Sequence, residues 1–520
     1  MKKYLLMTGI SLFTLLFATS CLKDEGNYDY VELEDFYVDT VGVRHNFTVK
    51  QFESFELTPK LIYEGDKSSL EYKWELYKSE DISIGASSYG TGFAHNYTRD
   101  DYPDYTLANT EDLSVVISAV PGSYYLVFTA TEPKTGVKAM MDYQLQVEGA
   151  IGTGLVVLYQ GISGIDIDVV SSPVFNGSLT EATFARHAYS TANESRPFAG
   201  EPRELVAAIY PANSYYYIYL TSTEDAVRLS SIDMSVAEEF EEMFAGKAPE
   251  KKDLSHIIVN GTAHFFVNDG VAYKCNYSSA LMTPLAMRNG MYEAVATNFT
   301  YAGNSVWYDA LNRRFLHSMM WSAEIAPIVN ASGAFDFGNV GKDLLYWSKG
   351  YYQGNDYANY CFFKNPSEDG QRYLYVFLAD QASGNSFTAK CAMDISACPD
   401  IVEAHSFATG ERGPIVFYST DSKVYRMNYN IDEGTSSAEN VWSPAAGEYI
   451  TRIELFKNAG INLENSALDK YLLVATYNES TAKGKIYVIQ SDISSGILNP
   501  EPAAIYEFDG RIADFDFMAQ

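Results

Sequence analysis

The segment FFVNDGVAYKCNY, residues 265–277, aligns without gaps with FYSTDSKVYRMNY, residues 417–429. Each segment has apolar and aromatic residues on both sides of a short polar turn, a pattern typical of β-hairpins. The two copies lie about 150 residues apart, which corresponds to three units of roughly 50 residues. This repeat predicts an all-β domain built from similar antiparallel units.

Further apolar hairpins with a polar turn occur at residues 155–168, 215–229, 306–316, 373–393 and 472–489. Together with the aligned pair they predict a β-propeller of about seven blades over residues 149–520. The apolar strand at residues 512–517 is expected to close the ring. A large two-layer sandwich is the structural alternative.

One helix is expected within this domain. Residues 235–238 read as a capping box, and Val236, Phe240, Met243 and Phe244 follow at helical spacing. We expect this helix to be an insertion between two blades that packs on the propeller.

The first part of the chain has the period of two that marks half-buried strands. Leu70, Tyr72, Trp74 and Leu76 alternate with polar residues, and a later hairpin turns at residues 132–136. These short strands and the central tryptophan predict an Ig-like β-sandwich over residues 36–148. Three glycines within residues 148–154 predict the boundary to the second domain.

The N-terminus predicts export and lipidation. Lys2 and Lys3 precede an apolar run, which is too short to span a membrane, and Cys21 follows it. Residues 1–20 resemble a bacterial lipoprotein signal peptide, although Ala18 stands where a leucine is commoner. Cys21 is then the acylated residue of a lipidated tether, residues 21–35, and its acyl chains make the anchoring stable.

Composition limits the partners. The formal net charge is -30, so a nucleic-acid partner is not expected. The 41 Tyr, 29 Phe and 5 Trp residues suit pleated sheets and can also stack on sugars or peptides. The four cysteines beyond Cys21 show no metal-ligand spacing, so neither a metal nor a cofactor is expected; Cys391 and Cys398 are candidates for a disulfide.

Two acid pairs, Asp166/Asp168 and Asp514/Asp516, are spaced so that both carboxylates of a pair lie on one face of a strand. Such pairs can share a proton or hold a calcium ion. The sequence has no motif of a serine hydrolase, a zinc protease or a phosphate-binding loop, and its seven histidines are scattered. The protein is therefore expected not to be an enzyme.

Two segments are candidates for binding. The first combines rings with glycine, asparagine and aspartate within fourteen residues, and its candidate ligand-binding residues are Trp347, Tyr351, Tyr352, Tyr357 and Tyr360. The alternative is a hairpin whose rings only pack. The second candidate is the polar, aromatic loop at residues 89–105, which is expected to contact a partner protein.

The chain resembles the PKD-like family of Bacteroidota lipoproteins. This resemblance rests on Cys21, the leader at residues 26–30, the Tyr72-Lys73-Trp74 segment, and the strands at residues 122–125 and 143–147. A strict PKD repeat has Trp-Asp-Phe-Gly-Asp-Gly, whereas this chain has Trp74-Glu75-Leu76-Tyr77.

The resemblance implies a surface lipoprotein, lipid-anchored on the extracellular face of the outer membrane. Lys23-Asp24-Glu25 looks like the surface-export tag of such proteins, and Thr40 lies in a segment like their O-glycosylation acceptor. It also implies a Sus-type TonB-dependent transporter and its lipoprotein lid as partners in oligosaccharide or peptide uptake. Alternatives are a propeller glycosidase or lyase that uses an Asp pair, and a structural or adhesive surface protein.

Overall fold

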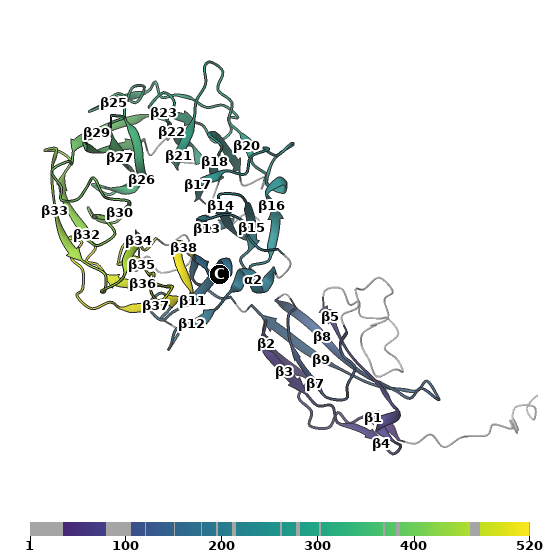
Figure 1. Ribbon diagram of the computed structural model, residues 1–520. Coiled ribbons are helices and arrows are strands. Elements are labelled where there is room, and N and C mark those ends of the chain that lie inside the picture. Colours follow the sequence, from purple (N-terminus) through teal and green to yellow (C-terminus); the bar gives the residue numbers. More distant parts are fainter. Residues whose placement is uncertain are drawn as a thin grey trace, which may run out of the picture. The chain divides into compact units, whose positions relative to one another are not determined.

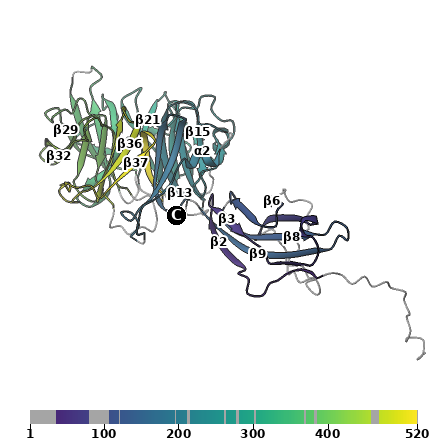
Figure 2. The ribbon, with the colours of Figure 1, turned by 60° about the horizontal axis from the view of Figure 1, so that its bottom comes forward.

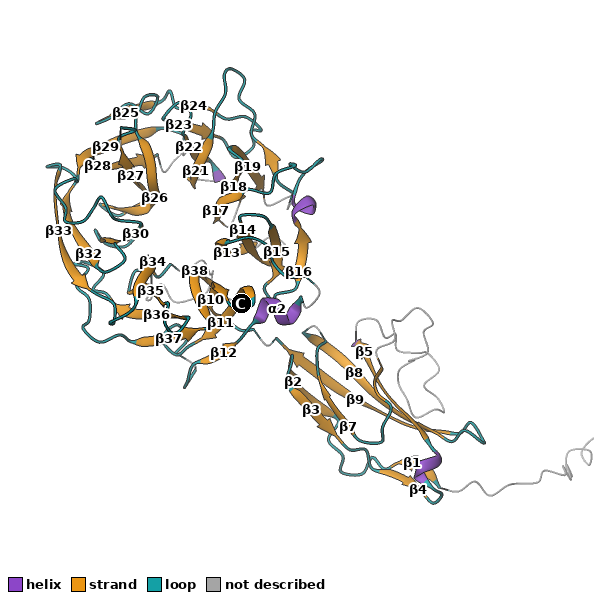
Figure 3. Ribbon diagram, viewed as in Figure 1, coloured by secondary structure: helices purple, strands orange, loops and turns teal. Residues whose placement is uncertain are grey.

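The computed structural model describes residues 35–79, 106–119, 121–149, 151–177, 179–193, 196–210, 215–260, 263–276, 281–300, 303–367, 370–380, 385–457 and 468–518. The chain divides into two compact units, Met1–Glu148 and Gly149–Gln520. Strands dominate both units (Figure 3), so the prediction of an all-β chain is confirmed. Helical structure in the described part is short and includes η1 (Lys67–Ser69), α2 (Ala188–Ala192) and η3 (Phe240–Met243).

The first unit contains a five-stranded sheet and two strand pairs. The sheet has the order β2 (Asn46–Lys50), β9 (Lys138–Glu148), β8 (Gly122–Thr131), β5 (Glu71–Lys78) and β6 (Thr106–Ala108). The pairs are β3 (Ser54–Leu57) with β7 (Leu113–Val116), and β1 (Phe36–Val38) with β4 (Leu61–Tyr63). The predicted terminal hairpin is β8–β9.

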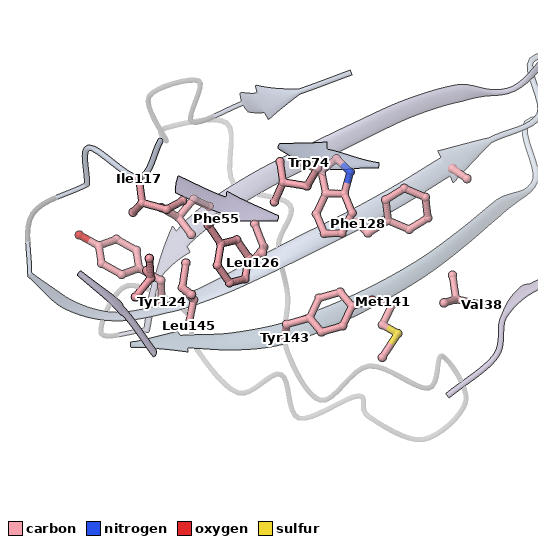
Figure 4. Packing of buried hydrophobic residues seen from close by; sticks show 14 of the residues in the cluster. Val38, Phe55, Trp74, Ile117, Tyr124, Leu126, Phe128, Met141, Tyr143 and Leu145 are labelled. Atoms are coloured by element: carbon pink, nitrogen blue, oxygen red, sulfur yellow. The ribbon is translucent and has the colours of Figure 1, made fainter. Parts of the chain in front are cut away.

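The core of this unit forms around Trp74, which is fully buried (Figure 4). Its ring centroid lies 4.8 Å from that of Phe128 and 6.0 Å from that of Tyr143. The indole Nε1 donates a hydrogen bond to the Thr110 carbonyl at 3.1 Å, so burial leaves no unpaired donor. Phe55 and Leu113 from the β3–β7 pair complete the cluster, as a two-layer sandwich requires.

In the described part of the second unit, seven sheets surround a common centre (Figure 1). The first three are β12 (Thr183–Ala185), β11 (Gly164–Ser171), β10 (Gly154–Gly161) and β38 (Gly510–Met518); β13 (Pro202–Tyr210), β14 (Tyr215–Ser222), β15 (Ala226–Ser230) and β16 (Val236–Glu239); and β17 (Leu254–Asn260), β18 (Ala263–Asn268), β19 (Val271–Asn276) and β20 (Thr283–Pro284).

The fourth and fifth sheets are β21 (Ala294–Phe299), β22 (Ser305–Asp309), β23 (Arg314–Ser318) and β24 (Ala326–Pro327); and β25 (Ala331–Gly333), β29 (Phe387–Asp394), β28 (Arg372–Ala379), β27 (Asn355–Lys364) and β26 (Asp343–Tyr352). The last two are β30 (Ser406–Thr409), β31 (Val416–Ser419), β32 (Val424–Asn430) and β33 (Thr435–Trp442); and β34 (Tyr449–Leu455), β35 (Tyr471–Asn478), β36 (Lys483–Gln490) and β37 (Ala504–Phe508).

Each predicted hairpin forms two adjacent strands of one sheet: β10–β11, β14–β15, β18–β19, β22–β23, β28–β29, β31–β32 and β35–β36. The predicted closing strand is β38, which pairs antiparallel with β10 although about 350 residues separate them. Figure 2 shows the strands of these sheets from another side. We call β38, β13, β17, β21, β26, β30 and β34 the inner strands, since they lie nearest the ring centre in Figure 1.

The predicted helix at residues 235–244 is wrong. Val236–Glu239 forms β16 and pairs with β15, and only Phe240–Met243 is helical. The reason lies across the strand pair, where the guanidinium of the buried Arg228 donates to Glu238 at 2.6 Å. A buried cation requires a paired carboxylate, and β16 supplies it. Glu239 and Glu242 form the capping box of the short helix that follows.

Candidate functional site

The predicted aromatic segment is split between two hydrophobic cores. Trp347 on β26 is 4% exposed and packs against Phe315 and Phe377 at ring-centroid distances of 5.5 and 6.0 Å. Tyr360 on β27 is fully buried in a different cluster, where its ring lies 5.9 Å from that of Tyr429. Both rings pack in hydrophobic clusters, as the packing alternative expects, and Trp347 also lines a cavity of about 520 Å³ among the inner strands.

The other three tyrosines differ from one another. The hydroxyl of the half-buried Tyr352 donates to Asp432 at 3.3 Å. Tyr357 lies in β27, and its side chain is outside the described residues. Tyr351 lines a cavity of about 730 Å³. The five predicted residues therefore do not form one surface, and Tyr351 alone of the described four reaches this cavity.

We call this space the rim cavity. Four segments from three neighbouring sheets form it: the end of β26, the β30–β31 loop, the residue before β35, and the segment from the end of β36 onward. Its lining residues are Tyr351, Arg412, Gly413, Pro414, Lys470, Gln490, Ser491, Asp492, Ile493, Ser494, Ile497, Leu498 and Asn499. Residues far apart in the sequence thus meet at one place because the ring brings their sheets together.

A buried carboxylate fixes one wall of the rim cavity. Asp469 is fully buried and accepts the backbone N–H groups of Glu411 at 2.5 Å and Arg412 at 2.6 Å. Its other oxygen accepts from Lys457 Nζ at 3.0 Å. A buried charge that is paired and hydrogen-bonded in this way holds the β30–β31 loop in one conformation.

The β30–β31 loop also passes close to the segment that follows β36, which forms another wall of the rim cavity. A Cβ atom on Gly413 would lie 1.7 Å from the carbonyl oxygen of Ile493, so only glycine fits there. In that wall, Asp492 Oδ1 accepts hydrogen bonds from the backbone and hydroxyl groups of Ser494 and Ser495. These bonds lower the pKa of Asp492 to about 2, so its carboxylate is ionised at neutral pH.

The acid pair Asp514/Asp516 lies on β38, beside a second cavity of about 520 Å³ among the inner strands. Asp514 accepts the Leu205 N–H at 2.9 Å and pairs with Arg452 at 2.9 Å, and Asp516 accepts the Ala207 N–H at 2.8 Å. Both residues therefore join the last strand of the chain to β13.

Other inner strands are joined in the same manner. The Glu204 carboxylate accepts the N–H groups of His256 and Ile257 at 2.7 and 2.9 Å, which joins β13 to β17. The Ser406 hydroxyl accepts the Ile453 N–H at 3.0 Å, which joins β30 to β34. Adjacent sheets of a ring share no ladder of backbone hydrogen bonds. Hydrogen bonds from these polar side chains to the backbone connect the sheets instead.

Burial raises the pKa of Asp516 to about 8, and the Glu454 carboxylate acts in the same direction. The folded protein therefore holds this proton more tightly than the unfolded chain, whose aspartate pKa is about 4. The contribution of Asp516 to the free energy of unfolding is expected to fall as the pH rises from about 4 to about 8.

Asp516→Asn removes this titration, and we expect the variant to gain about 1–2 kcal/mol relative to the parent between about pH 5 and about pH 8.5. Urea unfolding at both pH values measures the difference. Asp394→Asn, at an exposed carboxylate of the same unit, keeps Asp516 and is the control, so its stability should follow that of the parent at both pH values. An equal pH trend in Asp516→Asn and the parent would contradict the assignment.

The pair Asp166/Asp168 has a similar structural use. Asp168 is fully buried and accepts from Tyr159 OH at 3.0 Å, His187 N at 2.8 Å and Arg186 Nη1 at 2.7 Å. Asp166 accepts from the backbone and hydroxyl of Ser190 at 3.1 and 2.6 Å. The pair points to one face, as its spacing predicts, and fixes the segment that leads into α2.

Metal and thiol chemistry have no organised site in the described part of the chain. No group of three or more His, Cys, Asp or Glu side chains there is arranged to hold a metal ion. Cys275, Cys361, Cys391 and Cys398 are free and buried, so the structure contains no Cys391–Cys398 disulfide. Burial raises the pKa of the Cys391 and Cys398 thiols, which keeps them protonated.

Two predicted features lie outside the described residues: Cys21 with its signal peptide and the tether up to residue 34, and the loop at residues 89–105. Thr40 is described and exposed, and its modification stays a prediction. No helix among the described residues is long and apolar enough to cross a membrane.

Solved structures with a similar strand arrangement have low sequence identity. A quinoprotein alcohol dehydrogenase-like protein from Bacteroides thetaiotaomicron is 11% identical with a TM-score of 0.46, covering 94% of this chain and 97% of that chain. YCF48 from Cyanidioschyzon merolae is 9% identical with a TM-score of 0.37, covering 58% and 87%. Virginiamycin B lyase from Staphylococcus aureus is 11% identical with a TM-score of 0.35, covering 59% and 84%.

No curated protein matches the sequence. A family model does match it, and the match includes the whole described part of the first unit and continues through the first three strands of the second. Residues 21–202 of this chain are similar to the PKD-like family.

Proposed function

We propose that this protein is a non-enzymatic lipoprotein that binds a ligand at the cell surface, anchored in the outer membrane through Cys21. The sequence around Cys21 supports the anchor. The rim cavity supports the binding, because its volume of about 730 Å³ is in the range of small-molecule sites. The acid pairs that an enzyme could use are instead bonded to the backbone.

The observation that carries the proposal is the place of Tyr351. Tyr351 lines a cavity that is also lined by the amide-bearing residues Gln490 and Asn499. A flat ring beside directional hydrogen-bonding groups is what sugar or peptide recognition requires.

The finer proposal is that each of the seven sheets is one propeller blade and that the protein is an accessory component of a Sus-type TonB-dependent system for oligosaccharide or peptide uptake. Its support is the resemblance of the N-terminal sequence to surface lipoproteins and the match to the PKD-like family. Purification of the lipidated protein from native outer membranes should recover a TonB-dependent transporter. A preparation without one would contradict this partner.

Tyr351→Ala is expected to weaken ligand binding about ten-fold or more, because it removes the ring that a bound sugar or peptide would contact. Glycan and peptide arrays identify the ligand, and calorimetry measures its affinity. Tyr37→Ala, at an exposed tyrosine of the first unit, is the control and should leave affinity unchanged. Equal affinity in Tyr351→Ala and the parent would place the ligand elsewhere.

Cys21→Ala is expected to abolish incorporation of labelled palmitate and to release the protein from the membrane fraction, since the acyl chains supply the anchoring energy. Replacing Lys23, Asp24 and Glu25 by alanine should keep the palmitate and remove access of protease added to whole cells. Palmitate incorporation in Cys21→Ala would refute the lipid anchor. Protease resistance of the parent protein on whole cells would refute surface exposure.

A further inference from the structure

The rim cavity carries positive charge in a strongly acidic protein. The chain has a formal net charge of -30, yet Arg412 and Lys470 both line this cavity. Neither forms an ion pair with any residue that the structure describes. Asp492, the one carboxylate among the lining residues, is engaged at Oδ1 within its own turn.

Several other cations of this unit are paired with carboxylates. Arg196 is paired with Asp225 at 2.8 Å, and Lys457 with Asp469 at 3.0 Å. Asp469 accepts the backbone N–H of Arg412, whose exposed side chain lines the cavity. A guanidinium can bind a carboxylate or sulfate through two parallel hydrogen bonds, and an ammonium adds a mobile point charge.

A buried hydroxyl at the same cavity is also unused. Ser491 is 3% exposed, and its Oγ has no hydrogen-bond partner among the described residues. Buried polar groups in native proteins are nearly always paired, so this hydroxyl is an exception in the wall of the cavity. The Asn499 amide donates to Gln490 Oε1 at 3.3 Å, which leaves further donor capacity on both amides.

From these observations we infer that the rim cavity binds an acidic saccharide, whose carboxylate or sulfate contacts Arg412 and Lys470 and whose ring lies against Tyr351. The inference rests on the proposed function and names the ligand class of its site. Several neutral donors beside one ring suit the hydroxyls of a sugar better than the backbone of a peptide. The positive charges of Arg412 and Lys470 favour an anionic sugar over a neutral one.

The test uses the whole chain and four probes: a galacturonate oligosaccharide, its methyl ester, a sulfated oligosaccharide of the same length, and an acidic peptide. We expect the acid to bind at least ten-fold more tightly than the ester, with an affinity that falls as salt is added. Arg412→Gln and Lys470→Gln should each reduce this preference several-fold. Lys247→Gln makes the same charge change at a side chain that is 83% exposed and remote in sequence, and serves as the control.

Equal affinities for acid and ester, unchanged preference in both cation variants, or no binding of either anionic probe would overturn the inference. Binding of neutral glycans that Tyr351→Ala abolishes would then leave the proposed function intact. Tight binding of acidic peptides but of no anionic glycan would replace the saccharide by a peptide. Loss of all binding in every arm would reject the proposed function as well.

Discussion

Removal of residues 510–520 is expected to prevent the second unit from folding as a closed ring. The deletion takes away β38, which is the inner strand of the first sheet and pairs with β10 along its whole length. Ile512, Phe515, Phe517 and Met518 are all buried, and each buried apolar side chain contributes about 1.5–3 kcal/mol. Their sum is comparable with the whole net stability of a domain, about 5–15 kcal/mol.

Polar contacts add to this loss. Asp514 and Asp516 join β38 to β13, and Arg452 of β34 pairs with Asp514. Without β38, three neighbouring sheets lose their contacts at the centre of the ring. Arg452, which keeps only a 3.4 Å contact with Glu454, loses its closest carboxylate partner.

Calorimetry of the full chain with and without residues 510–520 measures this effect. The expected result is loss of the transition of the second unit, with the transition of the first unit retained. Deletion of residues 519–520 alone, which removes no residue of β38, is the control. An unchanged calorimetric profile after the longer deletion would show that the other six sheets close without the C-terminal strand.

The hairpins of the second unit could be predicted because their signal is local. Alternating apolar residues around a polar turn determine a strand pair within about twenty residues, and the structure has all seven pairs. The helix at residues 235–244 was wrong for a non-local reason. Its sequence suits a helix in isolation, but Arg228 on the neighbouring strand requires Glu238 as a partner.

The rim cavity could not be predicted in the same way. Arg412, Lys470 and Ser491 are isolated polar residues in the sequence, and only the ring brings them beside Tyr351. The predicted aromatic segment contained Tyr351, yet alternation along β26 and β27 sends other rings of that segment into the core. Composition indicates that rings are abundant there, but the register determines which of them a ligand can reach.

Trp347→Ala is expected to show how strongly the core depends on one of those rings. The indole packs with Phe315 and Phe377, and its Nε1 donates to Asn359 Oδ1 at 3.0 Å. Replacement of a buried tryptophan by alanine leaves a large cavity, and we expect a loss of about 3–5 kcal/mol in the free energy of unfolding. Urea unfolding of the full chain measures this loss in the transition of the second unit.

Trp321→Ala is the matched control, because Trp321 is 66% exposed and its replacement should change stability by about 0.5 kcal/mol or less. The binding assay separates a role in the core from a role in recognition. Under conditions where Trp347→Ala remains folded, a core role predicts ligand affinity close to that of the parent. A variant with parent stability but without ligand binding would instead show that the ring turns outward to the ligand, as the sequence pattern alone suggests.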